Sequence, residues 1–288
     1  MMIVGAYVGF SKLLVAVFPV FLLAWLRFGI AAVVMVTWLT PSAAEAPLDA
    51  RTRYLLFAES FVGNFLFSIC LLFGMRHATA ISAGVIMAGI PAVIALLSWF
   101  FLKERLSLRM IVAIALGVLG VAVLALSREG RGGHDARTSS MLGTALLLGA
   151  VLCEAVYVVV GKRLTGSLSP KRISALINLW GLALVTPLGI YAAWSFDFAA
   201  VDLSIWGGLV LYALAASMWT VWLWMTGLKT VPAAKAGVFS VFLPITSALV
   251  GVLFLGETFS TAHAMAFACA LAGVVLATWP TTHAASAA

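Results

Sequence analysis

Apolar residues fill most of the chain in long runs that short polar segments interrupt. A membrane helix needs about 20 predominantly apolar residues, and ten runs come close to or exceed that length: residues 2–18, 20–40, 54–75, 80–102, 107–127, 141–163, 172–194, 204–227, 233–255 and 260–279. A polar linker that begins at Pro41 and includes RTRY separates the second run from the third. The pattern therefore predicts an all-α membrane protein with ten transmembrane helices.

The two halves of the chain repeat each other. Residues 74–125 align without a gap with residues 227–278, and 16 of these 52 columns are identical, Pro91 with Pro244 and Glu104 with Glu257 among them. Five helices per copy is an odd number, so the second copy crosses the membrane in the opposite sense. We expect two inverted five-helix repeats around a central cavity: residues 1–127, a linker at 128–140, residues 141–279, and a cytoplasmic tail at 280–288. Met1 aligns with Val151, so the first helix is expected to enter late or to be incomplete.

Basic residues predict the orientation of the chain, because Lys and Arg concentrate in cytoplasmic loops. With the N-terminus inside, eleven face the cytoplasm and four face out. The eleven are Arg51, Arg53, Lys103, Arg105, Arg109, Lys162, Arg163, Lys171, Arg172, Lys229 and Lys235. The four are Arg76, Arg128, Arg131 and Arg137. Both termini are therefore predicted to be cytoplasmic.

Composition agrees with this class of protein. The 288 residues are 64% hydrophobic and 9% charged, whereas a soluble domain carries roughly a quarter charged residues. The net charge of +7 is explained by basic loops, so no nucleic-acid partner is expected. Cys70, Cys153 and Cys269 lie inside apolar runs without metal spacing and are expected to pack as small apolar residues.

Pro91 and Pro244 lie in the middle of the fourth and ninth predicted helices. Proline removes a backbone donor and so frees polar backbone at mid-depth. Membrane helices tolerate single prolines, but two at symmetry-related positions favour a hinge or substrate site near the bilayer centre.

Glu154 lies inside the sixth predicted helix, about 12 Å from Lys162 at ~1.5 Å per residue. A carboxylate at that depth costs ~2.5 kcal/mol or more, so it should face a polar cavity or be neutral. It could carry a proton or pair with a substrate ammonium group. The alternative is a neutral carboxyl that bonds a neighbouring helix.

Arg27 and Lys12 are the two basic residues predicted within helices. Arg27 could either extend its stem to the interface or pair with a substrate carboxylate, and for Lys12 we favour the interface. Glu104 and Glu257 each end a helix just before a serine, where a carboxylate stabilises the next helix N-terminus.

Polar side chains form two stripes that could line a cavity or bind helices together. One is Ser60, Asn64 and Ser68 in the third helix; the other is Ser217, Thr220 and Trp224 in the eighth, with Trp219 and Trp222 adjoining. Tyr7 and Tyr157 correspond between the halves, and each is a candidate either to contact a ligand or only to pack. Gly5 and Gly9 provide a small face for close helix contact. Motifs of soluble catalysis such as HExxH, GxSxG and a phosphate loop are missing, so no enzyme, metal or cofactor is expected.

The repeated AxSAGV…P…FLKERLS…GVLGV pattern and the segment LLAWLRFGIAAVV resemble the EamA-type domains of the drug/metabolite transporter (DMT) superfamily. That resemblance spans nearly the whole chain. It implies a ten-helix carrier whose first, third, fourth, sixth, eighth and ninth helices line the cavity, similar to the YddG-type amino-acid exporters. The chain departs from that type at Ile90 and Glu154, where aromatic residues are expected, so its pocket is expected to favour other amino acids.

We interpret the chain as a carrier of the bacterial-type inner membrane that exports an amino acid or similar small metabolite by alternating access. The expected partners are this substrate and the lipid bilayer, and a monomer suffices because one chain supplies the pathway. A carrier for another metabolite or drug class, a membrane-embedded enzyme acting on a lipid-linked substrate, and a channel remain alternatives. The candidate substrate-binding residues are Tyr7, Asn64, Ser68, Met87, Pro91, Glu154, Tyr157, Trp219, Trp224, Ser240 and Pro244, with Glu154 also the candidate for proton coupling.

Overall fold

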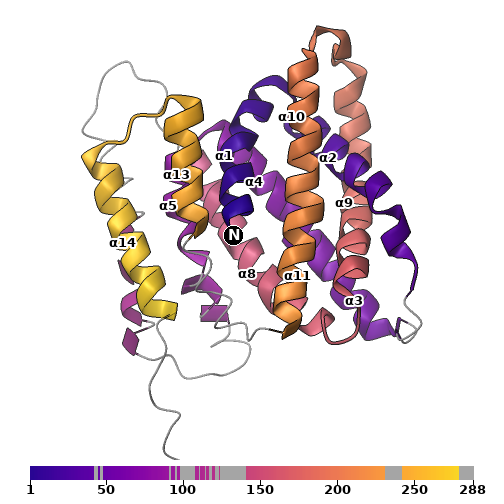
Figure 1. The fold of residues 1–288 in the computed structure, drawn as a ribbon, viewed down its shortest axis with the longest axis horizontal. Helices are drawn as coiled ribbons and strands as arrows, with labels where there is room; N and C mark the ends of the chain where they lie inside the picture. Colours follow the sequence, from indigo (N-terminus) through magenta and orange to yellow (C-terminus); the bar gives the residue numbers. More distant parts are fainter. Residues whose placement is uncertain are drawn as a thin grey trace, which may run out of the picture.

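The computed structural model describes residues 1–41, 45, 48–90, 92–94, 96–97, 108–109, 111–113, 115–116, 119–120, 123, 141–230 and 242–278, and every regular element in this part of the chain is helical (Figure 1). In the first half these elements are α1 (Met2–Val17), α2 (Val20–Val34), η1 (Val36–Leu39), α3 (Ala50–Ala58), η2 (Glu59–Leu66), α4 (Phe67–Arg76) and α5 (Ala80–Met87). In the second half they are α8 (Met141–Leu164), α9 (Pro170–Trp194), η3 (Phe198–Ala200), α10 (Leu203–Ala213), η4 (Leu214–Trp219), α11 (Thr220–Thr230), α13 (Phe242–Leu255) and α14 (Thr261–Thr278).

Four helical stretches of the described chain are long and apolar enough to cross a membrane. They are Ala50–Arg76, Met141–Leu164, Pro170–Trp194 and Leu203–Thr230. Shorter apolar helices include Met2–Val17 and Val20–Val34. The fifth predicted span (107–127) lies largely outside the described residues, as do Pro91, Ser240, the linker at 128–140 and the tail at 280–288.

The predicted boundaries need correction around the second and third helices. α2 ends at Val34 and is followed by the 3-10 turn η1, so the predicted run to residue 40 is not one α-helix. RTRY is not a linker but the first turns of α3, which begins at Ala50. Its N-cap residue Asp49 accepts a hydrogen bond of 2.8 Å from the Thr52 backbone N–H, a standard start signal that outweighs the polarity of the segment.

Two of the long stretches contain a π-helical segment at their centre. η2 interrupts Ala50–Arg76 and η4 interrupts Leu203–Thr230. The alignment of the two halves pairs Asn64 in η2 with Ser217 in η4, so the segments fall at corresponding positions. π-helical turns are frequent at functional sites, so the space between η2 and η4 is a candidate site.

The core is built where the two halves of the chain meet. α2 packs along α9, α4 along α8, and α1 and α5 along α13. Leu22, Phe28 and Leu72 from the first half form one buried cluster with Leu147 and Val185 from the second. The halves are therefore interleaved rather than separate.

α1 and α13 approach to backbone contact through two glycines. A Cβ at Gly5 would lie 2.0 Å from Thr246 Oγ1 and 2.3 Å from the Leu243 carbonyl oxygen, and one at Gly9 would lie 2.7 Å from Val250. The predicted small face is thus confirmed, and its partner is α13.

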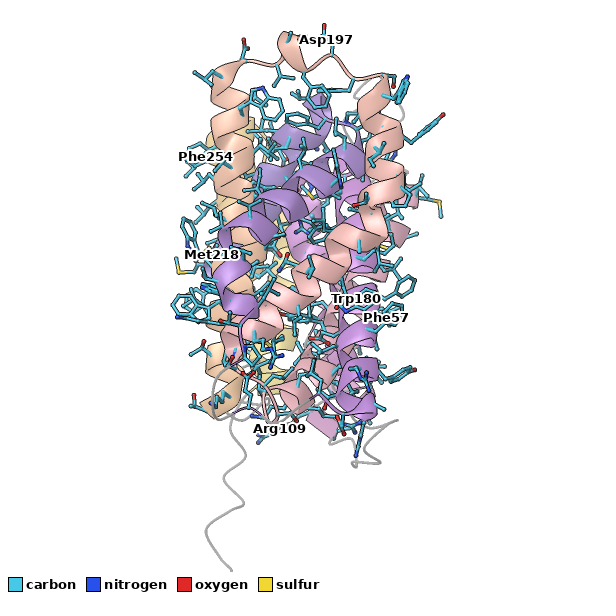
Figure 2. All side chains as sticks on the ribbon, turned by 90° about the vertical axis from the view of Figure 1, so that its right-hand side faces the viewer. Phe57, Arg109, Trp180, Asp197, Met218 and Phe254 are labelled. Carbon is cyan, nitrogen blue, oxygen red and sulfur yellow. The ribbon has the colours of Figure 1, made fainter. Side chains whose placement is uncertain are left out.

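The two ends of the helical bundle differ in charge. Asp197 lies at one end and Arg109 at the other (Figure 2); we call these the Asp197 end and the Arg109 end. The Arg109 end also carries the start of α3, the junction between α8 and α9, and the end of α11 (Figure 1). Those segments hold basic residues: Arg51, Arg53, Lys162, Arg163, Lys171, Arg172 and Lys229.

Near the Asp197 end, Glu257 and Lys12 both bind backbone groups around the start of α5. Glu257 accepts hydrogen bonds from the N–H groups of Ala80 (2.8 Å) and Ile81 (3.0 Å), so it caps α5 and not the following helix α14. Lys12 donates to the Ala78 carbonyl and lies 3.8 Å from Glu257. The Lys12 side chain is partly exposed there, and its interface-reaching role stays a prediction. Glu104 lies outside the described residues.

Candidate functional site

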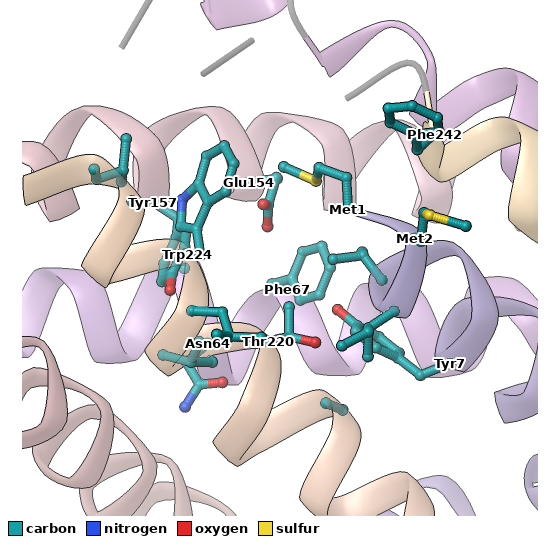
Figure 3. A pocket seen from close by; sticks show the side chains of 18 of the residues that line it. Met1, Met2, Tyr7, Asn64, Phe67, Glu154, Tyr157, Thr220, Trp224 and Phe242 are labelled. Carbon is teal, nitrogen blue, oxygen red and sulfur yellow. The ribbon is translucent and has the colours of Figure 1, made fainter. Parts of the chain in front are cut away.

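A cavity of about 450 Å³ opens between helices of both halves, next to the two π-helical segments (Figure 3). Its size falls within the range of small-molecule sites, roughly 300–1,000 Å³. Its walls come from α1, α2, η2, α4, α8, η4, α11 and α13. The lining residues are Met1, Met2, Ile3, Val4, Tyr7, Arg27, Gly63, Asn64, Phe67, Glu154, Tyr157, Ala216, Thr220, Val221, Leu223, Trp224, Gly227, Leu228 and Phe242.

One wall of the cavity contains a buried guanidinium group. Arg27 is 2% exposed, and its Nη2 donates a 2.5 Å hydrogen bond to Ser68 Oγ. The guanidinium carbon lies 4.2 Å from the centre of the Phe28 ring and 6.0 Å from that of Tyr212. The interface-reaching role considered for Arg27 is therefore wrong, because its head group stays among aromatic rings beside the cavity.

Glu154 supplies a carboxylate to the same cavity. It projects from α8 next to Trp224 and Met1, while Tyr7 and Asn64 enter from the other side (Figure 3). It is half-buried and lines the cavity. Among the described lining residues, Glu154 is the acidic side chain and Arg27 is the basic one.

Several hydrogen-bonding groups around the cavity have no partner among the described residues. They are Arg27 Nε, the Tyr157 hydroxyl, Thr220 Oγ1 and Trp224 Nε1, all shielded from bulk solvent. Buried polar groups are normally paired, and each exception needs an explanation. A polar ligand in the cavity would supply the missing partners.

The polar residues of η2 are held in place by neighbouring helices. Asn64 donates through Nδ2 to the Ile177 carbonyl of α9 at 3.0 Å, and Ser68 donates to the Asn64 carbonyl. In the second half, Asn178 donates to the Ser217 carbonyl of η4 at 2.9 Å. These bonds use backbone carbonyls near both π-helical segments and fix the cavity walls.

Of the sequence-predicted site residues, the structure brings five to the cavity: Tyr7, Asn64, Glu154, Tyr157 and Trp224. Three others lie outside its lining. Ser68 contacts the cavity only through Arg27, Met87 is a fully enclosed core residue of α5, and Trp219 is 37% exposed at the surface. Pro244 lies in α13, while Pro91 and Ser240 lie outside the described residues.

The sequence analysis missed two polar residues near the cavity. Thr220 belonged to the polar stripe of the eighth helix but was not selected. Glu59 was not considered at all, although it is a carboxyl five residues inside the predicted third helix, the same signal that singled out Glu154. It lies one helical turn before Gly63, which lines the cavity.

Comparison with known proteins gives the class to which this site belongs. A family model described as the EamA-like transporter family matches residues 1–126 and 141–279. The chain belongs to this family. Its match covers both halves of the chain, and with it the elements that line the cavity.

Individual relatives of this EamA-like protein agree. It is 34% identical over 275 residues to a Bacillus subtilis protein described as the uncharacterized transporter YetK. The aligned region covers 95% of this chain and 83% of that relative. It is 22% identical to the uncharacterized transporter YyaM of the same organism over 85% of this chain and 80% of that relative. A solved crystal structure matches the fold with a TM-score of 0.65 at 22% identity, over 96% of this chain and 94% of the other.

The EamA-like chain is accordingly a membrane transporter of the DMT superfamily and not an enzyme. Its described residues contain no group of three or more His, Cys, Asp or Glu side chains that could hold a metal ion. The cavity is therefore a candidate binding site for the transported solute.

Proposed function

We propose that this transporter is an inner-membrane carrier that exports an amino acid or a similar small zwitterionic metabolite. The observation that supports it is the pair of opposite charges, Arg27 and Glu154, in one cavity of about 450 Å³. The candidate substrate-binding residues are Arg27, Glu154, Tyr7, Asn64, Tyr157, Thr220 and Trp224.

The chemistry of these groups fits the two charges of an amino acid. A guanidinium binds a carboxylate through directed, charge-assisted hydrogen bonds, and Arg27 has a free Nε donor. An ammonium group would pair with Glu154 and lie against the ring of Trp224 or Tyr157. The remaining wall, with Val4, Phe67 and other apolar residues, would contact the solute's side chain.

Alternating access would be provided by ten membrane helices in two inverted five-helix repeats. The corresponding positions of η2 and η4 support this arrangement. A second sign is that Lys12 and Lys162, which correspond between the halves, each donate to a carbonyl near the end of a long helix: Ala78 beyond α4, and Leu228 in α11 at 2.5 Å. The basic residues of the Arg109 end favour a cytoplasmic location for that end, with both termini inside.

Glu154 is also the proposed residue for proton competition in the cavity. A carboxylate that binds a substrate ammonium cannot hold a proton at the same time, so protons and substrate would compete for it. We expect substrate affinity to fall as the pH is lowered, and Glu154→Gln to abolish that pH dependence while weakening binding roughly ten-fold or more, the equivalent of about 1.4 kcal/mol.

Binding to the purified protein tests the proposal. A panel of amino acids is screened by scintillation proximity or thermal shift against the native protein, Arg27→Gln and Glu154→Gln. The control is the surface variant Trp219→Phe, whose affinity for amino acids should equal that of the native protein. We expect at least one zwitterion to bind saturably and to lose affinity in both cavity variants. Binding only of molecules that lack either the carboxylate or the ammonium would instead indicate another metabolite or drug class.

A further inference from the structure

Glu59 is a second intramembrane carboxyl whose presence the solute site does not explain. It is the first residue of η2, it is 0% exposed, and neither carboxyl oxygen has a hydrogen-bond partner in the part of the chain that the structure describes. A Cβ on Gly161 would lie 2.9 Å from Glu59 Oε1. The carboxyl is therefore pressed against the backbone of α8.

Glu59 lies one helical turn from the cavity, whether the distance is followed along η2 or along α8. Gly63 follows it by one turn in η2, and Tyr157 precedes Gly161 by one turn in α8; both line the cavity. A Cβ on Gly63 would lie 2.7 Å from Tyr157 Cβ, so the two helices touch there. Since η2 continues from α3, Glu59 is on the side of the cavity that faces the Arg109 end.

The described groups that could neutralise a charge on Glu59 do not do so. On α8, Glu154 is also acidic and Tyr157 is neutral. The Lys162 ammonium donates to the Leu228 carbonyl, and Arg163 is exposed. Across α8, α11 contributes Met225, whose thioether also crowds Gly161. The charged residues of the other helices that pack on η2 are at helix ends, exposed or engaged elsewhere: Arg51, Arg53, Arg76, Lys171 and Arg172.

An ionised carboxylate without a partner cannot be kept in such a place, because its desolvation is not offset. Glu59 therefore holds a proton in the conformation seen here. It can release that proton only if water or a cation reaches it, which requires η2 and α8 to separate. A carboxyl kept merely for packing would be expected to bond a neighbouring helix, and this one does not.

We propose that Glu59 is a second protonation site of the carrier, occupied by a proton in this conformation and emptied when η2 and α8 separate. The inference rests on the proposed carrier function. A transmembrane proton gradient would then bias the conformational change through Glu59, whereas Glu154 governs competition inside the cavity.

Conformation can be followed apart from transport by thiol labelling. Gly227 lines the cavity in the last turn of α11, and a Cβ there meets no atom within 4 Å. Gly227→Cys, in a background without the native cysteines, therefore reports access of a thiol reagent to the cavity. Ser195→Cys, at an exposed position after α9, corrects for the pH dependence of the thiol reagent. We expect the corrected labelling rate to rise several-fold from pH 8 to pH 6.

Glu59→Gln, a permanently neutral replacement, should give a high labelling rate that does not change with pH. Ser60→Ala, which changes a buried neighbour in η2, should keep the pH response of the parent. In proteoliposomes, Glu59→Gln should retain solute counterflow within about two-fold and lose most of the uptake driven by a pH gradient. A Glu59→Gln protein whose labelling follows pH like the parent would overturn the inference.

Two further outcomes keep the test decisive. If Glu59→Gln does not fold, Glu59→Asp replaces it: a shifted midpoint of the pH response supports the proposal, and an unshifted midpoint overturns it. If the parent exchanges no amino acid at all, the proposed substrate fails, but the labelling experiment still decides the role of Glu59.

Discussion

At the scale of single residues, the two tryptophans Trp224 and Trp219 lie in different surroundings. Trp224 lines the cavity with a shielded and unpaired Nε1, while Trp219 is 37% exposed at the surface. Both were equally good candidates in the sequence, because tryptophans at 219, 222 and 224 occupy more than one helical face and the turns of η4 alter the register.

This difference gives a matched prediction. Trp224→Ala should weaken solute binding roughly ten-fold, since it removes a ring face and a donor worth about 1–2 kcal/mol. Trp219→Ala should leave the dissociation constant within about two-fold. Equilibrium binding to both purified variants is the measurement, and equal losses in the two would place the solute somewhere other than this cavity.

Glu45 links the segment after η1 to the start of α9. Its carboxylate accepts hydrogen bonds from the Ser169 N–H (2.7 Å) and from Arg172 Nη1 (2.5 Å). Burial alone would raise the pKa of Glu45, but the bonds from Ser169 and Arg172 outweigh it and lower the pKa below its usual 4.5. A lowered pKa contributes stability above the unfolded value, and this stability is lost as the pH falls through the folded value.

We therefore expect Glu45→Gln to lower the melting temperature of the detergent-solubilised protein by a few degrees at pH 7, and by less as the pH drops below about 4.5. Asp202→Asn is the control, because the Asp202 side chain makes no capping hydrogen bond. A Glu45→Gln deficit that is constant across pH would show that the ion pair does not supply the stability.

At the scale of elements, the contact between α1 and α13 depends on Gly5 having no side chain. Gly5→Ala would place a methyl group 2.0 Å from Thr246 Oγ1 and 2.3 Å from the Leu243 carbonyl oxygen, and backbone cannot yield as a flexible side chain can. We expect a loss of about 1–3 kcal/mol in stability, as for overpacked cores.

Gly207→Ala in α10 is the matched control, since its Cβ would meet no atom within 4 Å. Alanine favours helix over glycine by up to about 1 kcal/mol, so this variant should be neutral or slightly more stable. Thermal unfolding followed by size-exclusion chromatography compares the two. Equal stability of Gly5→Ala and the native protein would mean that α1 and α13 are not in contact in the membrane.

Hydrophobic runs predicted the helical class, and the Gly5–Gly9 pair predicted a close helix contact. They could not predict where α3 begins, because RTRY is too polar for the hydrophobic pattern of a membrane helix. The start of α3 is instead set by its N-cap residue Asp49. Nor could they predict η2 and η4, since a π-helical turn has no hydrophobic signature of its own.

At the scale of the whole molecule, the cavity is a product of both halves. Tyr7 and Asn64 come from the first, and Glu154, Tyr157 and Trp224 from the second. Internal repetition and residue chemistry predicted these five from the sequence. The sequence left two roles open for Arg27, reaching the interface or pairing with a substrate carboxylate. Only the packing of Phe28 and Ser68 around its head group distinguishes them.

The central claim is that this cavity binds and translocates a zwitterionic solute. Counterflow of radiolabelled amino acids into proteoliposomes preloaded with the same solute tests it most directly, with native protein compared to Arg27→Gln and Glu154→Gln at matched reconstitution. We predict saturable exchange by the native protein and at least ten-fold slower exchange by both variants at low solute concentration. Exchange at the native rate by both variants, or no exchange of any amino acid, would contradict the account.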